Sequence, residues 1–373
     1  MQAIDNTTEN INLEDNPFTF ENLTWAAMEC MKGVGWKNGT ARWRMNLLGN
    51  CRRLETELAD GTYRQGKPNV FHITSPKPRD VSALLLRDRV VHKVICHQGG
   101  LIEDMFRNAY SCNCACQTGK GTSYAIKLFD RMLHDFYRKY GADGVIVAVD
   151  IRHFFDSIPH DNLIGWVYRR VRRKRIRRMV RDIINGYPGD RGIGLGSEIS
   201  QVLANSYLTP VDYVVKQVLG IEHYIRYADN LICVMPMRLP GVNEQGDSVV
   251  IDGRDYARKV YDGITYAVST LGLELNAASC IHPLRQGVNF LGFRWRLTQS
   301  GHVCRTVLKK SVGRIRRRLS RLASLYHQGK RTLEQVMACY DSWAAYAKNA
   351  TAINTIKKVK DNLMEALHEG AYC

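Results

Sequence analysis

Two acidic residues in this sequence lie at the ends of runs that are typical of buried strands. Asp150 follows the apolar run 144–149, and Asp229 lies in a short polar turn between the runs 224–227 and 231–234. Carboxylates are hard oxygen ligands that suit Mg²⁺ or Mn²⁺. If the strands are neighbours in one sheet, the two acids could share a pair of metal ions, as nucleotidyl transfer requires. The alternative is that each acid simply ends a strand near solvent.

The elements that would position these acids follow from the periodicity of apolar residues. Residues 236–253 are rich in Pro, Gly and Asp, which predicts a surface insertion, and residues 305–373 are expected to be helical and basic. Short strands among helices predict an α/β (α+β) fold. The expected helices are about 20–33, 41–59, 82–96, 159–185, 196–220 and 254–272, and the expected strands are about 70–74, 144–150, 224–234 (a hairpin), 273–282 and 288–297.

The overall charge points to a polyanionic partner. The 373-residue chain has 53 Lys and Arg against 36 Asp and Glu, a net charge of +17, which suits nucleic acid or an anionic membrane surface. No apolar run reaches the roughly 18 residues that a membrane-spanning helix needs. Residues 1–16 lack the pattern of a signal peptide. We therefore expect a cytoplasmic protein whose 11 cysteines are reduced.

Two short segments hold much of the positive charge. Residues 169–178 contain eight Lys and Arg, and residues 309–318 contain six. Self-repulsion at this density is costly unless a phosphate backbone offsets it, although a solvated charged helix is the alternative. Contacts with nucleic acid are expected from Arg172, Arg173, Lys174 and Arg175 in the first segment and from Lys309, Lys310, Arg316 and Arg317 in the second.

Six sequence blocks, taken in order, resemble bacterial reverse transcriptases. They are Ser75–Arg79 with Arg87–His92, Val149–His160, Gly194–Gln201, Tyr227–Asn230, Gly272–Asn276 and Asn289–Phe293. The chain is most similar to the reverse transcriptases of diversity-generating retroelements and to related anti-phage defence reverse transcriptases, over about residues 47–295. No single block is specific for this family, but the order and spacing of all six blocks are specific for it.

The resemblance implies a right-hand polymerase fold, in which fingers and a palm with an antiparallel sheet are followed by a helical thumb. The chain leaves little room after the thumb for a nuclease or RNA-maturation domain. The expected ranges are an N-terminal extension (1–45), fingers (46–145), a palm (146–300) with a finger-like helical insertion at about 160–186 and the surface insertion 236–253, and a basic thumb (301–373).

The resemblance also assigns roles to individual residues. Asp150 and Asp229 would bind two Mg²⁺ ions, or Mn²⁺ in their place, and the backbone carbonyl of Ile151 would be a further ligand. Phe155 would lie beneath the sugar of the incoming dNTP and exclude a 2′-hydroxyl. The other expected dNTP contacts are Lys77, Arg79, Gly196 and Gln201, and further nucleic-acid contacts are expected from Arg87 and Arg89.

The second catalytic block departs from the family pattern, which usually has two acids. Here Asp229 is followed by Asn230, so the catalytic set Asp150, Asp229 and Asn230 carries one negative charge fewer. We expect weaker metal binding and slow or Mn²⁺-favouring synthesis. A tolerated natural change, an engineered substitution and a natural pseudoenzyme are the competing explanations.

Two further departures concern fidelity and acid catalysis. Leu195 stands where many reverse transcriptases have Gln, and a Leu cannot hydrogen-bond near the templating base, which favours relaxed fidelity. Ser279 stands near a position where some members carry Lys, so the general acid is unassigned.

The resemblance implies RNA-templated DNA synthesis from a dedicated structured noncoding RNA, in an anti-phage defence system. The alternatives are error-prone cDNA synthesis in a diversity-generating retroelement and a catalytically weakened RNA-binding scaffold. The expected partners are the RNA template, the cDNA product, dNTPs, and an accessory protein or second reverse transcriptase, without a membrane. An ATPase is disfavoured because Gly119–Thr122 lacks the full spacing of a phosphate-binding loop.

Overall fold

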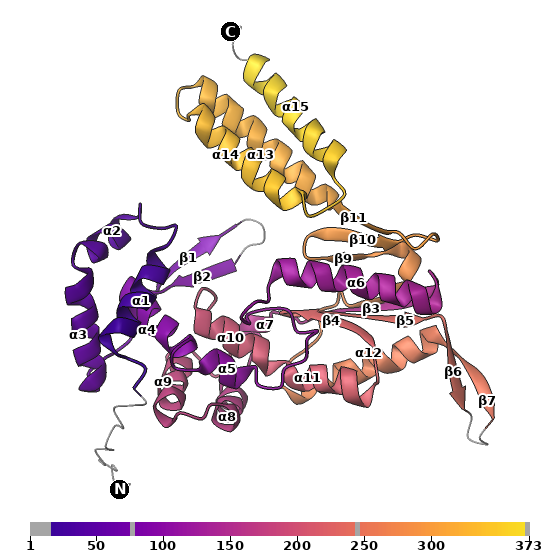
Figure 1. Cartoon of the computed structure of the whole chain (residues 1–373), viewed down its shortest axis with the longest axis horizontal. Coiled ribbons are helices and arrows are strands. Elements are labelled where there is room, and N and C mark those ends of the chain that lie inside the picture. Colours follow the sequence, from indigo (N-terminus) through magenta and orange to yellow (C-terminus); the bar gives the residue numbers. More distant parts are fainter. Residues whose placement is uncertain (1–15, 75–78, 243–246, 370–373) are drawn as a thin grey trace. The chain divides into compact units, whose positions relative to one another are not determined.

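The computed structural model describes residues 16–74, 79–242 and 247–369. Over these ranges the chain is a mixed α/β protein whose sheets are antiparallel (Figure 1). The helices are α1 (Phe20–Met31), α2 (Asn38–Met45), α3 (Leu47–Ala59), α4 (Leu86–Cys96), α5 (Leu101–Met105), α6 (Thr122–Tyr140), α7 (Phe154–Ser157), α8 (His160–Arg170), α9 (Lys174–Asn185), α10 (Glu198–Tyr207), α11 (Thr209–Tyr213), α12 (Gly253–Thr270), α13 (Lys309–His327), α14 (Leu333–Ala347) and α15 (Ile353–Glu369). The strands are β1 (Asn69–Ile73), β2 (Arg79–Ala83), β3 (Gly144–Asp150), β4 (His223–Tyr227), β5 (Asn230–Pro236), β6 (Arg238–Val242), β7 (Ser248–Asp252), β8 (Cys280–Pro283), β9 (Val288–Phe290), β10 (Phe293–Leu297) and β11 (Val303–Val307).

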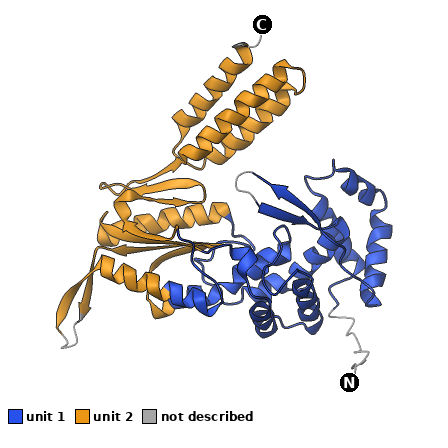
Figure 2. Ribbon diagram, turned by 180° about the vertical axis from the view of Figure 1, so that it is seen from behind, with its two compact units in different colours: residues 1–121, 151–214, 264–277 blue, residues 122–150, 215–263, 278–373 orange. Residues whose placement is uncertain are grey.

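The chain forms two compact units, each built from segments that are distant in the sequence (Figure 2). Unit 1 comprises residues 1–121, 151–214 and 264–277, and unit 2 comprises residues 122–150, 215–263 and 278–373. Each unit is described by itself below. None of the helices in the described ranges combines the length and the apolar character that crossing a membrane requires.

The main sheet of unit 2 has the strand order β4-β5-β3-β8. Strand β3 is central because its β-branched, apolar residues are buried on both faces of the sheet. Its register with β5 runs from Gly144 opposite Pro236 to Asp150 opposite Asn230. Gly144 is required at its position, since a Cβ there would lie 2.7 Å from the carbonyl oxygen of Met235.

A second, three-stranded sheet with the order β11-β10-β9 precedes the C-terminal helices of unit 2. Trp295 of β10 is fully buried. Its ring packs edge-to-face on Phe129 of α6 at a centroid distance of 4.8 Å, and its indole N–H donates to the carbonyl of Phe290 at 3.1 Å. Helix α13 packs against α14 and α15 to form a three-helix group (Figure 1).

Unit 1 is largely helical. Helix α1 packs on α3 and α4, and α10 packs on α4, α5 and α8. Helix α10 is apolar and buried along most of its length, as a helix at the centre of a helical layer must be. The two-stranded sheet of β1 and β2 also belongs to this unit.

The structure differs from the sequence expectations in several elements. The helix expected at 159–185 is two helices, because residues 171–173 are extended between α8 and α9. Only residues 280–282 of the strand expected at 273–282 are in a strand, β8, and the helix expected at 82–96 begins after strand β2. The segment 236–253 forms the β6–β7 hairpin, within which Val250 is 72% exposed.

Candidate active site and nucleic-acid interface

The candidate metal ligands of unit 2 lie at one end of its main sheet. Asp150 is the last residue of β3 and pairs with Asn230, the first residue of β5. Asp229 directly precedes Asn230 in the tight turn that joins β4 to β5. The condition stated for the sequence, that the two apolar runs are neighbours in one sheet, is met by the strand register, and the two acids lie at the same end of that sheet.

The turn that carries Asp229 is held in an uncommon backbone conformation. Ala228 has a φ of +52°, in the left-handed region that costs energy for a residue with a side chain. The fully buried Arg226 donates a hydrogen bond to the carbonyl of Ala228 at 3.1 Å. Tyr227, which pairs with Asn230 across the hairpin, contacts the hydroxyl of Thr122 at 3.1 Å. These contacts hold the turn in its strained backbone conformation. Backbone strain that surrounding contacts stabilise is typical of functional sites.

Asp150 and Asp229 each have a neighbour that orients them. The hydroxyl of Ser279 accepts a hydrogen bond from the backbone N–H of Asp150 at 3.1 Å and donates to its carbonyl at 3.2 Å. The side-chain amide of Asn230 donates to the carboxylate of Asp229 at 3.3 Å. Ser279 therefore positions Asp150 through its backbone, and Asn230 positions the carboxylate beside it.

The residues of this cluster fit a divalent ion of the hard, oxygen-preferring type. Asp150 and Asp229 are half-buried and Asn230 is exposed, so all three can be reached from solvent. Two carboxylates and one carboxamide at a sheet end offer only oxygen ligands, as Mg²⁺ prefers. With Asn230 neutral, two negative charges would face the metal instead of three.

The segment of unit 1 that follows Asp150 in the chain holds Phe155. Ile151 is buried and forms a bridge with Leu275, next to a hydrogen bond from Arg152 N–H to the Glu274 carbonyl at 2.9 Å. Phe155 is half-buried in α7. Its carbonyl accepts a hydrogen bond from the backbone of Ile193 at 2.9 Å, which joins this segment to the one that contains Gly196 and Gln201.

The block from Gly194 to Gln201 is held rigidly within unit 1. The carbonyl of Leu195 accepts from the backbone N–H of Ser82 in β2 at 2.9 Å. Gly196 has a φ of +119°, and a Cβ there would lie 2.7 Å from the carbonyl oxygen of Ser82, so only glycine fits. Gly196 and Gln201 are both exposed and available to a ligand.

The start of α10, directly after Gly196, is fixed by α4. Ser197 is the N-cap of α10, and its hydroxyl accepts from the backbone of Ser200. His92 contacts this hydroxyl through Nδ1 at 3.1 Å and the side chain of Gln65 through Nε2 at 2.8 Å. Burial lowers the pKa of His92 to about 4. Glu198 then forms ion pairs with Lys93 and His97 of α4, both at 2.9 Å. Sequence reasoning did not find this network, because its members lie about a hundred positions apart.

The expected triphosphate ligands cannot both be placed. Arg79 begins strand β2, pairs with Ile73 across the β1–β2 hairpin and is exposed. Lys77 lies outside the described residues.

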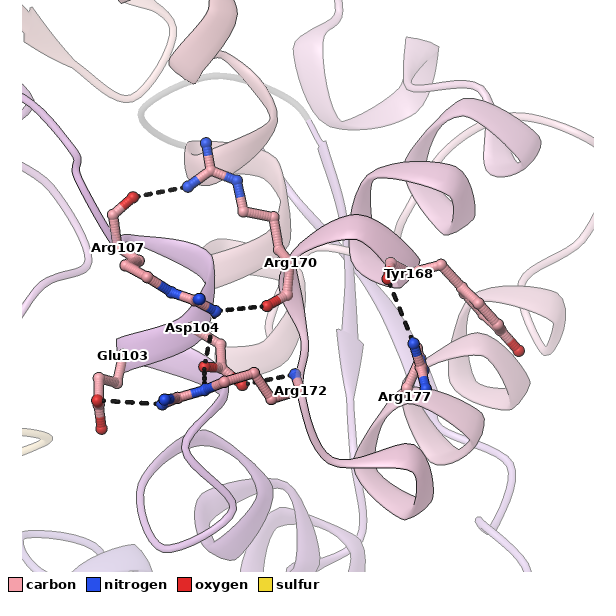
Figure 3. Close-up of polar contacts among 7 residues, drawn as sticks. All are labelled: Glu103, Asp104, Arg107, Tyr168, Arg170, Arg172 and Arg177. Atoms are coloured by element: carbon pink, nitrogen blue, oxygen red, sulfur yellow. Dashed lines mark hydrogen bonds and ion pairs between the residues drawn. The ribbon is translucent and has the colours of Figure 1, made fainter.

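The basic segment 169–178 makes many contacts inside unit 1 (Figure 3). Arg172 donates to the buried carboxylate of Asp104 through its backbone at 2.9 Å and through Nε at 2.7 Å, and it also pairs with Glu103. Arg107 and Arg170 donate to each other's backbone carbonyls at 2.9 and 2.7 Å. Burial and the neighbouring Arg107 lower the pKa of Arg170.

The other arginines of this segment also have partners. Arg173 donates to the carbonyl of Gln98, Arg175 to the carbonyl of Leu58, and Arg177 to the carbonyl of Tyr168 (Figure 3 for Arg177). Lys174 is exposed and has no hydrogen bond or ion pair with any residue of the described ranges. Direct contact with a ligand is therefore easiest for Lys174 among the four residues expected to bind nucleic acid.

Among the other residues expected to contact nucleic acid, those in α4 form contacts within the protein, and most of those in α13 are exposed to solvent. Arg87 pairs with Glu57, and Arg89 donates to the carbonyl of Cys30 at 3.2 Å. In α13 the side chains of Lys309, Lys310 and Arg317 are exposed, while Arg316 is half-buried. Arg316 and Arg317 line a groove against α15 of about 650 Å³.

A second group that could hold a metal ion lies in unit 2 and was missed from the sequence. It comprises Asp135 of α6, Glu222 and His223, whose ligand atoms lie within 4.8 Å of one another. His223 contacts Asp135 at 3.1 Å, and this hydrogen bond lowers the pKa of Asp135, while burial lowers the pKa of His223. Lys139 pairs with both Glu222 and Asp135. A metal ion would have to displace its ammonium group.

No protein-family model and no curated protein sequence matches the chain. Its function is therefore inferred from the geometry of the candidate active site and of the candidate nucleic-acid interface.

Proposed function

We propose that the chain is a reverse transcriptase, an RNA-templated DNA polymerase with a right-hand polymerase fold. The observation that carries the proposal is the pairing of Asp150 with Asn230 on adjacent strands, with Asp229 in the turn beside them. An antiparallel sheet that brings such a set of oxygen ligands to one end is what two-metal nucleotidyl transfer needs.

This proposal assigns a separate role to each of these residues. Asp150 and Asp229 hold the metal ions, and Ser279 and Asn230 hold these two acids in place. Divalent ions held there by Asp150 and Asp229 would supply the Lewis acidity that activates the 3′-hydroxyl of a primer and neutralises charge on the triphosphate. In this proposal Phe155 lies beneath the sugar of the incoming nucleotide, where its ring would disfavour a 2′-hydroxyl and so select dNTPs.

The template in this proposal is a structured noncoding RNA, and the biological setting is anti-phage defence. The basic face of α13 and the charge of the segment 169–178 support a nucleic-acid partner. Mutagenic cDNA synthesis in a diversity-generating retroelement is the alternative setting. Phage protection after transfer into a naive host supports the first, and a neighbouring variable repeat supports the second.

One observation favours a second candidate, an RNA-binding scaffold with weakened catalysis. The carboxamide of Asn230 replaces a charged metal ligand, while the basic surfaces do not depend on it. The two candidates differ in what the Asp150→Asn variant does, since a scaffold keeps its biological function without this acid.

Primer extension tests the proposal directly. The chain is incubated with a primed RNA template, dNTPs and either Mg²⁺ or Mn²⁺, and Asp150→Asn is compared with Asp143→Asn. Asp143 is an exposed acid directly before the other end of the same strand, so it controls for the loss of one charge. We expect Asp150→Asn alone to abolish incorporation. Equal activity of both variants, or no incorporation by the parent chain with either metal, would refute the polymerase.

A further inference from the structure

A cleft of about 680 Å³ lies within unit 1, and none of the residues that line it is assigned to metal or dNTP binding. One wall is the segment from Leu58 to Pro68, and the other is the face of α9 that presents Arg175, Met179 and Ile183. Its volume is within the range of sites that bind small organic ligands.

The rim of the cleft is cationic. Arg64 and Lys67 are exposed at the rim. Arg64 donates to the carbonyls of Gly61 and Tyr63, both at 2.8 Å, so that its guanidinium group is held in place with other N–H groups still available. Lys67 has no hydrogen bond or ion pair with any residue of the described ranges. The acid that lines the cleft, Asp182, pairs with Arg181 at 2.8 Å. This balance favours an anionic ligand.

The interior of the cleft is apolar. Leu58 is buried beneath it, and Met179 and Ile183, four residues apart on one face of α9, are half-buried against it. Tyr63 contributes a ring to the same lining. An apolar floor next to a cationic rim suits a planar, apolar group that is attached to a phosphate or carboxylate.

The wall that carries the cations is preorganised. The hydroxyl of Tyr63 and the backbone N–H of Gly66 donate to the two carboxylate oxygens of Asp88, at 2.8 and 3.1 Å. Asp88 is completely buried. A Cβ at Gly66 would lie 2.7 Å from the end of the Leu85 side chain and 3.2 Å from a carboxylate oxygen of Asp88, so a larger residue would require Leu85 to move. A wall that is already ordered loses little entropy when a ligand binds.

We propose that this cleft binds a nucleoside phosphate, either as a free nucleotide or as one unstacked nucleotide of a bound RNA. The base lies over Met179 and Ile183, and Arg64 and Lys67 hold the phosphate. The remaining N–H donors of the fixed guanidinium group of Arg64 can form a bidentate contact with such a phosphate. This site does not depend on the proposed polymerase activity, since none of its residues belongs to that site.

Fluorescence anisotropy of the full-length chain tests the cleft. The probes are a labelled nucleoside monophosphate and a labelled eight-nucleotide RNA, and EDTA excludes metal-dependent binding at Asp150 and Asp229. The variants are Lys67→Glu, which reverses a rim charge, and Ile183→Trp, which fills the cleft without a charge change. The control is Lys37→Glu, an exposed residue of unit 1 with the same charge change that neither lines the cleft nor is expected to contact nucleic acid.

We expect Lys67→Glu to raise the Kd about tenfold or more, the effect of losing one charge-assisted contact. We expect Ile183→Trp to raise it as well, because the indole ring occupies the space for the base. Lys37→Glu should change the Kd less than about twofold. If Lys67→Glu and Ile183→Trp weaken binding of the monophosphate alone, the ligand is a free nucleotide, and if they weaken binding of the RNA as well, it is a nucleotide of a bound RNA. Each variant is compared only if its circular dichroism and Tm match those of the parent.

Three results would overturn the proposal. They are the absence of binding of both probes at millimolar concentration, equal losses in Lys67→Glu and Lys37→Glu, and equally tight binding of an octaglutamate peptide. The first two exclude the cleft as a nucleotide site, and the third makes it a general site for acidic chains. None of these results bears on primer extension, so failure here and failure of the polymerase are distinguishable.

Discussion

Asn230 gives the most quantitative test of the candidate metal site. The Asn230→Asp change adds a carboxylate directly opposite Asp150 and next to Asp229. Because Asn230 is exposed, the dielectric constant of water is the appropriate one. A unit charge at about 4 Å from a divalent ion then contributes about 2 kcal/mol, which is about a 30-fold gain in metal affinity.

The same change destabilises the metal-free protein. It removes the hydrogen bond from the Asn230 amide to the Asp229 carboxylate and places two acids side by side. That loss is about 1 kcal/mol for an exposed charge-assisted contact. Mg²⁺ relieves the repulsion, so the metal should raise the Tm of the variant more than it raises the Tm of the parent.

Two assays measure these effects. Calorimetric titration of Mg²⁺ gives the affinity, and primer extension over a Mg²⁺ series gives the concentration at half-maximal rate. We expect both midpoints to fall about tenfold or more in Asn230→Asp, with the difference between Mn²⁺ and Mg²⁺ reduced. The control is Asn289→Asp, an exposed residue of β9 with the same charge change. Equal Mg²⁺ affinities in the parent and Asn230→Asp would refute the metal site at this end of the sheet.

Three further predictions follow from the contacts in unit 1. Replacement of Asp104 by Ala should lower the free energy of unfolding by about 2 kcal/mol, because the backbone N–H of Arg172 loses a charge-assisted partner, and urea unfolding measures this. His92 is held neutral with a pKa of about 4, below the ordinary value of 6.5, so it favours the unfolded state as the pH falls from 6.5 towards 4. The variant His92→Leu should therefore lose less stability over this window, by up to about 1.4 kcal/mol per pH unit, while its weakened contact with Ser197 lowers primer extension at neutral pH. Phe155→Val should raise the incorporation of NTPs relative to dNTPs in single-nucleotide assays, and an unchanged ratio would exclude this ring from sugar selection.

The pairing of Asp150 with Asn230 could be predicted because both flanking runs are apolar, β-branched and short. Such runs are buried on both faces of a sheet, and buried strands in one domain are commonly neighbours. The orienting role of Ser279 could not be predicted in this way. Its contact with Asp150 depends on the register between β3 and β8, which begins at Ala148 opposite Cys280 and which no local pattern encodes.

The break between α8 and α9 is a second feature that could not be predicted from the local sequence. The segment 169–178 has strong helical periodicity, and the sequence predicts one continuous helix. The buried carboxylate of Asp104 binds the backbone N–H and the side chain of Arg172 from 68 positions away and holds the residues between the two helices extended. A tertiary contact with a charged group outweighs local propensity here, as intrinsic preferences amount to less than about 1 kcal/mol per residue.

The contacts of the basic segment 169–178 affect its charge and its free N–H donors differently. Arg175 and Arg177 donate to neutral carbonyl oxygens, which use their N–H groups without cancelling their charge. Arg172 differs, because its partners are the carboxylates of Asp104 and Glu103. The segment therefore still attracts a polyanion over a Debye length, although most of its guanidinium groups are not free to form bidentate phosphate contacts. On this argument its charge should increase the rate of RNA association, and the exposed cations of α13 should determine the rate of dissociation.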